Sequence, residues 1–146
     1  MAESELREAI AALETTRARL EGLGRQEELL RRSLQEYQRA RNTMAEYREA
    51  EEGTEVLVPI GANSFLFAQV GDVERCIVGL GAEVALEDSL EGALGRMDNR
   101  IEQLTGIHEG LLERIGEMEA QANQRATQVQ QLYEQAQGEG GEEEGV

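Results

Sequence analysis

A heptad pattern in residues 88–137 restricts the fold of this chain more than any other feature of the sequence. Seam residues recur there at alternating spacings of four and three without a break, and all but His108 and Arg125 are apolar. The positions are Leu90, Leu94, Met97, Ile101, Leu104, His108, Leu111, Ile115, Met118, Ala122, Arg125, Val129, Leu132 and Ala136. A heptad run of this length predicts a long coiled-coil helix.

A second helical pattern covers residues 1–51, where the seam is less regular. The spacing predicts a phase change between Leu20 and Leu23, which is a three-residue step that would locally overwind a coiled coil. The predicted seam positions are Leu6, Ile10, Leu13, Arg17 and Leu20 in one phase, then Leu23, Leu30, Leu34, Tyr37 and Met44 in the next. Both helices would be roughly 70 Å long at 1.5 Å per residue, so we expect them to pair with each other, antiparallel.

Antiparallel pairing places Val129 opposite Ile10, and His108 beside Leu30 and Leu34. His108 has two interpretations, a pH-sensitive wedge in the seam or a tolerated polar residue with an exposed ring edge. The second is favoured, because seams often contain an occasional polar residue.

The segment between the helices, residues 52–87, has the period-two pattern of strands. Residues 61–63 predict the turn of a first β-hairpin, and a second hairpin is expected around Gly79 and Gly81. Pro59 cannot donate to a ladder of hydrogen bonds, which predicts an edge position or a bulge.

Two hairpins this small are marginally stable alone. The only cysteine, Cys76, can form no disulfide within the chain, and the only histidine, His108, lies far from the hairpins, which excludes a metal site there. We therefore expect the strands to join those of other subunits in a shared sheet or barrel. The predicted interface residues are Val56, Val58, Ile60, Phe65, Phe67, Val70, Ile77, Val78, Val84 and Leu86.

The composition restricts the partners. The net charge is −16, and all basic residues are arginine, so nucleic acid and anionic membranes are not expected as partners. The acidity fits either simple solubility or a salt-rich cytoplasm. No phosphate-binding glycine motif or catalytic dyad is recognisable, so neither an enzyme nor a cofactor is expected. The N-terminus does not read as a signal peptide, and with one buried cysteine a cytoplasmic location is expected.

The linker contains the phrases LVPIG at 57–61 and IVGLGAEVALE at 77–87, each placed between helices of matching length. With two hairpins, this arrangement resembles the alpha-type subunit of prefoldin. The resemblance implies a mainly α fold, in which a long antiparallel two-helix coiled coil is joined by two β-hairpins that form a shared oligomeric β-barrel. It also implies a hexamer of two alpha and four beta subunits that holds unfolded polypeptides without ATP and delivers them to a group II chaperonin.

The free ends of the two helices are the predicted site of client capture, because a two-helix coil cannot cover its own seam beyond the last paired layer. The candidates are Leu6, Ile10, Leu13, Val129, Leu132 and Tyr133, of which Ile10 and Val129 are expected mainly to hold the helices together. The alternative is a structural coiled-coil adaptor with an oligomeric β hub. Residues 138–146, all glycine and glutamate before the final Val146, are expected to be disordered.

Overall fold

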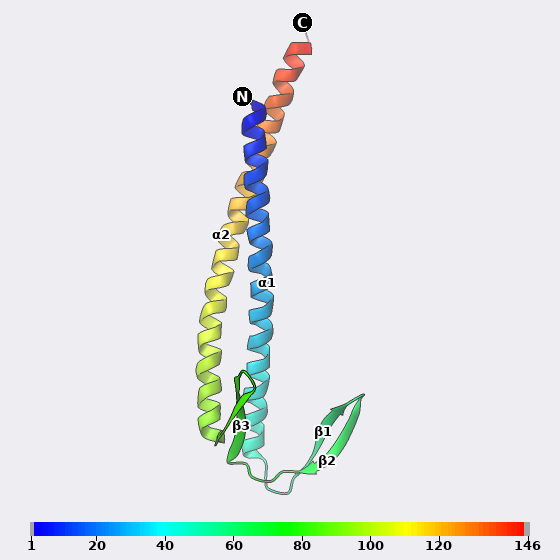
Figure 1. Cartoon of the computed structure of the whole chain (residues 1–146), viewed down its shortest axis with the longest axis vertical. Coiled ribbons are helices and arrows are strands. Elements are labelled where there is room, and N and C mark those ends of the chain that lie inside the picture. The colour runs from blue at the N-terminus through cyan, green and yellow to red at the C-terminus, as the bar shows by residue number, and fades with distance from the viewer. Residues whose placement is uncertain (1, 145–146) are drawn as a thin grey trace. The chain divides into compact units, whose positions relative to one another are not determined.

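The structure, a computed structural model, describes residues 2–144, with side chains up to residue 138. Helix α1 spans Ala2–Glu49 and helix α2 spans Leu90–Glu144. Between them lie β1 (Glu55–Gly61), β2 (Ser64–Gln69), β3 (Arg75–Gly81) and β4 (Val84–Ser89) (Figure 1). The predicted order of helix, two hairpins and helix is confirmed.

The chain divides into two compact units. The first unit, called the distal unit below, combines Met1–Arg31 with Gly106–Val146. The second, called the proximal unit, is Arg32–Thr105 and contains both hairpins. Each unit contains a part of α1 and a part of α2 running in opposite directions.

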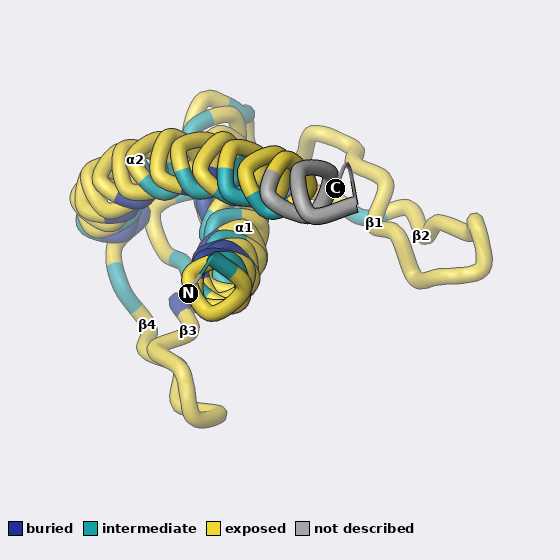
Figure 2. Tube along the Cα trace, turned by 90° about the horizontal axis from the view of Figure 1, so that it is seen from above, coloured by how far each residue is buried: buried dark blue, intermediate teal, exposed yellow. Residues whose placement is uncertain are grey.

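The seam of α2 lies where the heptad pattern predicts it. All fourteen predicted positions are buried or half-buried, including Leu94 at 8% exposure and Leu104 at 5%. The residues between them are mostly exposed (Figure 2). The regular spacing of four and three therefore identifies the packed face of this helix.

The seam of α1 differs from the prediction in its first part. Ala9 and Thr16 are buried, whereas Ile10 is 39% exposed and Arg17 is exposed. The buried and half-buried positions of α1 include one unbroken heptad series, so the predicted phase change between Leu20 and Leu23 is wrong. The series is Leu6, Ala9, Leu13, Thr16, Leu20, Leu23, Glu27, Leu30, Leu34, Tyr37, Arg41 and Met44. Ala9 and Thr16 occupy the layers that were assigned to Ile10 and Arg17. The heptad spacing, and not the size of the side chain, decides which residue faces the partner helix.

The first hairpin, β1 and β2, turns at Ala62 and Asn63, whose φ angles are 51° and 56°. Two successive positive φ values are typical of the type I′ turn, whose twist matches that of the flanking strands. The register shifts between Pro59 and Gly61, so a bulge, one of the two alternatives predicted for Pro59, lies directly after this residue.

The second hairpin, β3 and β4, repeats this design one position further along than predicted. Its turn lies at Ala82 and Glu83, with φ angles of 49° and 61°, just beyond the predicted place around Gly79 and Gly81. The register shifts between Gly79 and Gly81, so the glycines form the bulge and not the turn.

Helix α2 begins with an N-cap and continues beyond its predicted end. The Gly92 amide donates to Ser89 Oγ at 3.0 Å, which satisfies one of the free donors of the first turn. The backbone of α2 is helical to Glu144, beyond the predicted end at residue 137, and residues 145–146 lie outside the described residues. Disorder of the tail therefore stays a prediction.

Candidate functional site

The tip of the distal unit, meaning the end with residues 6–13 of α1 and 129–133 of α2, separates its predicted residues by exposure. Leu13 is buried at 7% exposure, while Leu6, Val129 and Leu132 are half-buried. Only Ile10 and Tyr133, at 39% and 52%, present much of their side chains to solvent. Leu13 is therefore unavailable for binding, and Ile10 does not hold the seam as expected, because Ala9 occupies that layer.

A groove beside the seam adds apolar surface that the sequence-based list omits. It measures about 460 Å³ and is lined by Gln26, Leu30, Ile107, Gly110, Leu111 and Arg114. Ile107 is a large apolar residue that lies outside the seam, and 58% of it is exposed. An isoleucine off the seam of an otherwise polar helix face was the signal that would have identified it.

The first hairpin exposes apolar side chains on both faces. In its register Val56 pairs with Ala68 and Val58 with Leu66, which defines one face. Leu57 pairs with Phe67 and Pro59 with Phe65 on the other face, called the aromatic face below. Phe65 is 56% exposed and Phe67 76%, and Leu57 and Leu66 are each 57% exposed. The predicted interface residues of this hairpin thus fall on two faces, and Leu57 and Leu66 were missed.

The second hairpin is covered on one face by its own chain. Val78 is buried at 9% exposure and its cross-strand partner Leu86 is 40% exposed, while Cys76 on the same face is half-buried. Ile77, on the opposite face, is 74% exposed. Of the predicted interface residues, Val78 and also Val70, at 4% exposure, are already buried within the chain.

Polar contacts tie the segment between the hairpins to the helix ends. The Tyr47 hydroxyl donates to the Asp72 carbonyl at 3.0 Å, and the Leu90 amide donates to the Glu74 carbonyl at 2.8 Å. Arg75 bridges Asp72 Oδ2 at 2.6 Å and Glu87 Oε1 at 2.7 Å. The hydrogen bond from the Glu74 amide, followed by that from Arg75, lowers the pKa of Asp72. These contacts fix residues 72–75 at the base of the second hairpin.

Cys76 has no features of a reactive thiol. It lies half-buried opposite Asp88. Burial, and to a lesser extent the charge of Asp88, raises the pKa of the thiol, and a protonated thiol is a poor nucleophile. Among the side chains that the structure describes, no group of three or more histidine, cysteine, aspartate or glutamate residues has the arrangement of a metal site.

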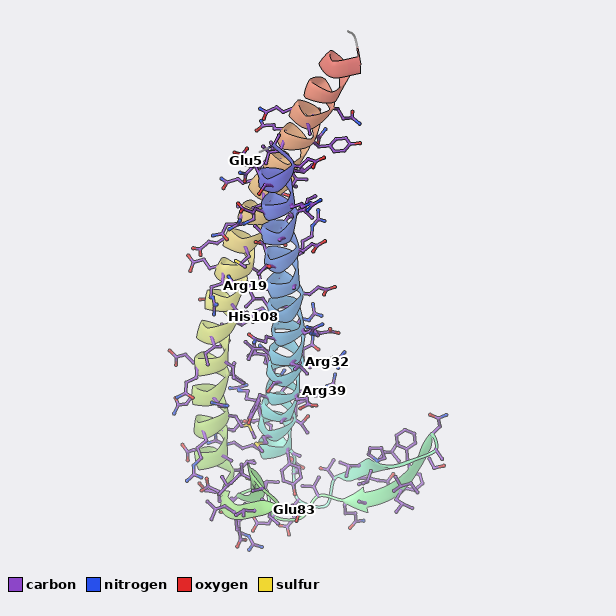
Figure 3. The ribbon with its side chains drawn as sticks, turned by 45° about the horizontal axis from the view of Figure 1, so that its top comes forward. Glu5, Arg19, Arg32, Arg39, Glu83 and His108 are labelled. Atoms are coloured by element: carbon purple, nitrogen blue, oxygen red, sulfur yellow. The ribbon has the colours of Figure 1, made fainter. Side chains whose placement is uncertain are left out.

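His108 meets a glutamate, which the sequence-based pairing did not anticipate. Its Nε2 lies 3.0 Å from Oε1 of Glu27, which lies on the seam of α1, one seam position before the expected Leu30. Figure 3 labels His108 among the side chains of the two helices. The two side chains are only 20% and 17% exposed. In the proximal unit a further cross-helix pair joins Arg41 Nε to Asp98 Oδ1 at 2.8 Å.

None of the described helices is apolar over a stretch long enough to cross a bilayer.

The family is decided by a match over most of the chain. The model of a family described as "Prefoldin subunit" matches residues 16–135, which include both hairpins and most of both helices. The chain belongs to the prefoldin family. The predicted resemblance to this family is thereby confirmed, and the family is one of chaperones rather than enzymes.

Similar proteins are prefoldin alpha subunits of archaea. The chain is 43% identical over 76 residues to "Prefoldin subunit alpha" of Methanopyrus kandleri, an alignment that covers 52% of this chain and 48% of the relative. It is 31% identical over 112 residues to that of Methanosarcina barkeri, covering 75% and 78%. In the matches to Methanopyrus kandleri, Thermococcus onnurineus and Methanosarcina acetivorans, this prefoldin chain spans about half of the relative's length.

A solved structure has the same fold. The structure described as "Cryo-EM structure of filamentous PFD from Methanocaldococcus jannaschii" is similar, with a TM-score of 0.51 and 25% sequence identity. The similarity covers 86% of this prefoldin chain and 98% of the other. The two-helix, two-hairpin architecture is therefore that of a prefoldin subunit whose relative forms an oligomeric assembly.

Proposed function

We propose that this chain is the alpha subunit of an ATP-independent prefoldin chaperone in the cytoplasm. Its hairpins join those of beta subunits in a shared β-barrel, as two alpha and four beta chains. The tips of its helices capture unfolded polypeptides and deliver them to a group II chaperonin. The observation that carries this proposal is the first hairpin, which presents apolar side chains on both faces in a chain of the prefoldin family.

The first hairpin supports assembly because its outer backbone groups and its apolar side chains have too few partners within the hairpin. A two-stranded ribbon has unpaired backbone groups along both outer edges, and exposed edges of this kind pair readily with other strands. Burial of apolar area stabilises by about 25 cal/mol per Å², and the first hairpin has eight large apolar side chains to contribute. These are Val56, Leu57, Val58, Pro59, Ile60, Phe65, Leu66 and Phe67.

The tip supports weak and general binding. Ile10 and Tyr133, with the half-buried Leu6 and Leu132, offer a few partly exposed side chains, each worth about 1.5–3 kcal/mol on complete burial. One tip alone therefore binds weakly, in the millimolar range at about −4 kcal/mol. Several tips that act on one chain raise the effective affinity through effective concentration, while folded proteins expose too little apolar surface to bind.

Aggregation of unrelated denatured proteins tests the proposal. The full chain is co-purified with its cognate beta subunit, its composition is measured by native mass spectrometry, and light scattering of two chemically denatured proteins is followed without nucleotide. We expect a hexamer that suppresses scattering of both proteins. An assembly that suppresses neither would support the structural adaptor and refute the chaperone.

Variants of the tip separate capture from assembly. The double variant Ile10→Ala/Tyr133→Ala should leave the hexamer intact and weaken suppression of scattering. The matched control is Leu29→Ala, which removes a side chain of 66% exposure from the helix surface away from the tip. Equal losses in the tip variant and in the control would contradict capture at the tips.

A further inference from the structure

The seams of the distal unit contain one layer in which a charged side chain of α1 meets a polar side chain of α2. Glu27 and His108 both occupy seam positions, their side chains are 17% and 20% exposed, and Oε1 lies 3.0 Å from Nε2. Because a carboxylate only accepts, Nε2 donates the proton of this hydrogen bond. Arg31, one turn further along α1, lies 4.0 Å from the same Glu27 oxygen.

The remaining seam of α1 explains why one such layer matters. The positions one heptad away from Glu27 are Leu20 and Leu34, and the next seam position is Leu30. A slip of one heptad would keep most apolar seam residues of α1 opposite apolar seam residues of α2. The same slip would place His108 against a leucine and leave Glu27 without its partner across the seam. A mostly buried polar group without a hydrogen bond is costly.

We propose that the Glu27–His108 pair fixes the register of the two helices in the distal unit. Apolar seam residues hold the helices together in any register that keeps apolar side chains opposite one another. The polar pair is satisfied in one register only, as a single buried polar residue selects one alignment in a coiled coil. The correct register is what brings Ala9 and Leu132 to one groove at the tip.

A second polar seam residue provides the matched control. Thr16 is also buried, at 5% exposure, but its hydroxyl donates to the Ala12 carbonyl of its own helix at 2.9 Å. It therefore carries no information about the position of α2. Replacement of Thr16 by valine keeps the shape of the side chain and removes the polarity.

Distances between spin labels at residues 11 and 120 test the proposal directly. Both positions are exposed alanines of the distal unit, and the labels are introduced as cysteines in the full chain carrying Cys76→Ala. The labelled chain is assembled with the cognate beta subunit and diluted with unlabelled chain, so that only distances within one chain are measured. A one-heptad slip moves one helix by about 10 Å along its axis.

The expected result is one narrow distance distribution for the wild-type pair and for Thr16→Val. The double variant Glu27→Leu/His108→Leu should remain helical and fold stably, because an apolar layer replaces the polar pair, but it should show a second, displaced distance population. Glu27→Gln, which still accepts the hydrogen bond from His108, should keep the single narrow distribution. The proposal is overturned if the double leucine variant is as narrow as wild type, or if Glu27→Gln is as broad as the double leucine variant.

Discussion

Replacement of Phe67 by alanine is expected to weaken assembly while leaving the isolated chain folded. Phe67 is 76% exposed and lies opposite Leu57 on the aromatic face, so its ring has little intramolecular packing to lose. Complete burial of a phenylalanine side chain contributes about 1.5–3 kcal/mol, and the exposed part therefore corresponds to roughly 1–2 kcal/mol that only a partner can supply. The dissociation constant of each contact made by this face should rise about five- to thirtyfold.

Dilution of the co-purified assembly, followed by mass photometry, measures this change. The control is Leu29→Ala, a side chain of similar exposure on the helix surface, which should leave the dissociation constant unchanged. Thermal unfolding of the isolated chain should be the same for wild type and Phe67→Ala. A dissociation constant within twofold of wild type would refute the reasoning, and so would a clear loss of stability in the isolated chain.

Three further predictions follow from burial, local geometry and charge. Leu13→Ala should lower the free energy of unfolding by about 2–5 kcal/mol, because Leu13 is 7% exposed in the seam, and chemical denaturation measures this loss. Gly24→Ala should raise that free energy by about 1 kcal/mol in the same assay, since an added methyl group meets nothing within 4 Å and alanine favours helix; a decrease would show that the glycine is needed. The carboxyl group of Asp72 should titrate below its ordinary value of 3.8 in an NMR titration. Because the pKa of Asp72 is lowered in the folded state, its ionised carboxylate should stabilise the fold fully at a pH above 3.8, and this stabilisation should be lost as the pH falls through the lowered pKa. Arg75→Gln should raise the pH at which Asp72 is half-titrated.

The sequence predicts the path of the backbone well, because its signals are local. The seam of α2 is determined by spacing alone, and every predicted position from Leu90 to Ala136 is buried or half-buried. The turn of the first hairpin lies within the predicted residues 61–63, at Ala62 and Asn63. Both features depend on the chain's own geometry and need no knowledge of a partner.

The seam of α1 was predicted wrongly where a large side chain lies next to the residue that has the correct heptad spacing. Ile10 was assigned to the seam because it is large and apolar, but the layer belongs to Ala9, in phase with Leu6 and Leu13. Arg17 was assigned to the seam in place of Thr16 in the same way, and the break in the pattern was inferred from these two choices.

The partner of His108 could not be predicted from spacing within one helix. Glu27 looks like an ordinary solvated glutamate until the unbroken heptad series of α1 places it in the seam. Its role depends on which residue of α2 lies opposite, and only the register of the two helices decides this. The predicted interface residues of the first hairpin fall on two faces, because the pairing register of β1 and β2, which the spacing within one strand does not give, decides which side chains share a face.

Hydrogen exchange of the first hairpin, measured in the isolated chain and in the assembly with beta subunits, tests the central claim most directly. If other subunits complete the sheet, amides of residues 55–69 should exchange far more slowly in the assembly, while those of α2 near Leu111 should be nearly unchanged. Equal exchange rates of the hairpin amides in the two states would contradict the account, because the strands would then have gained no partner.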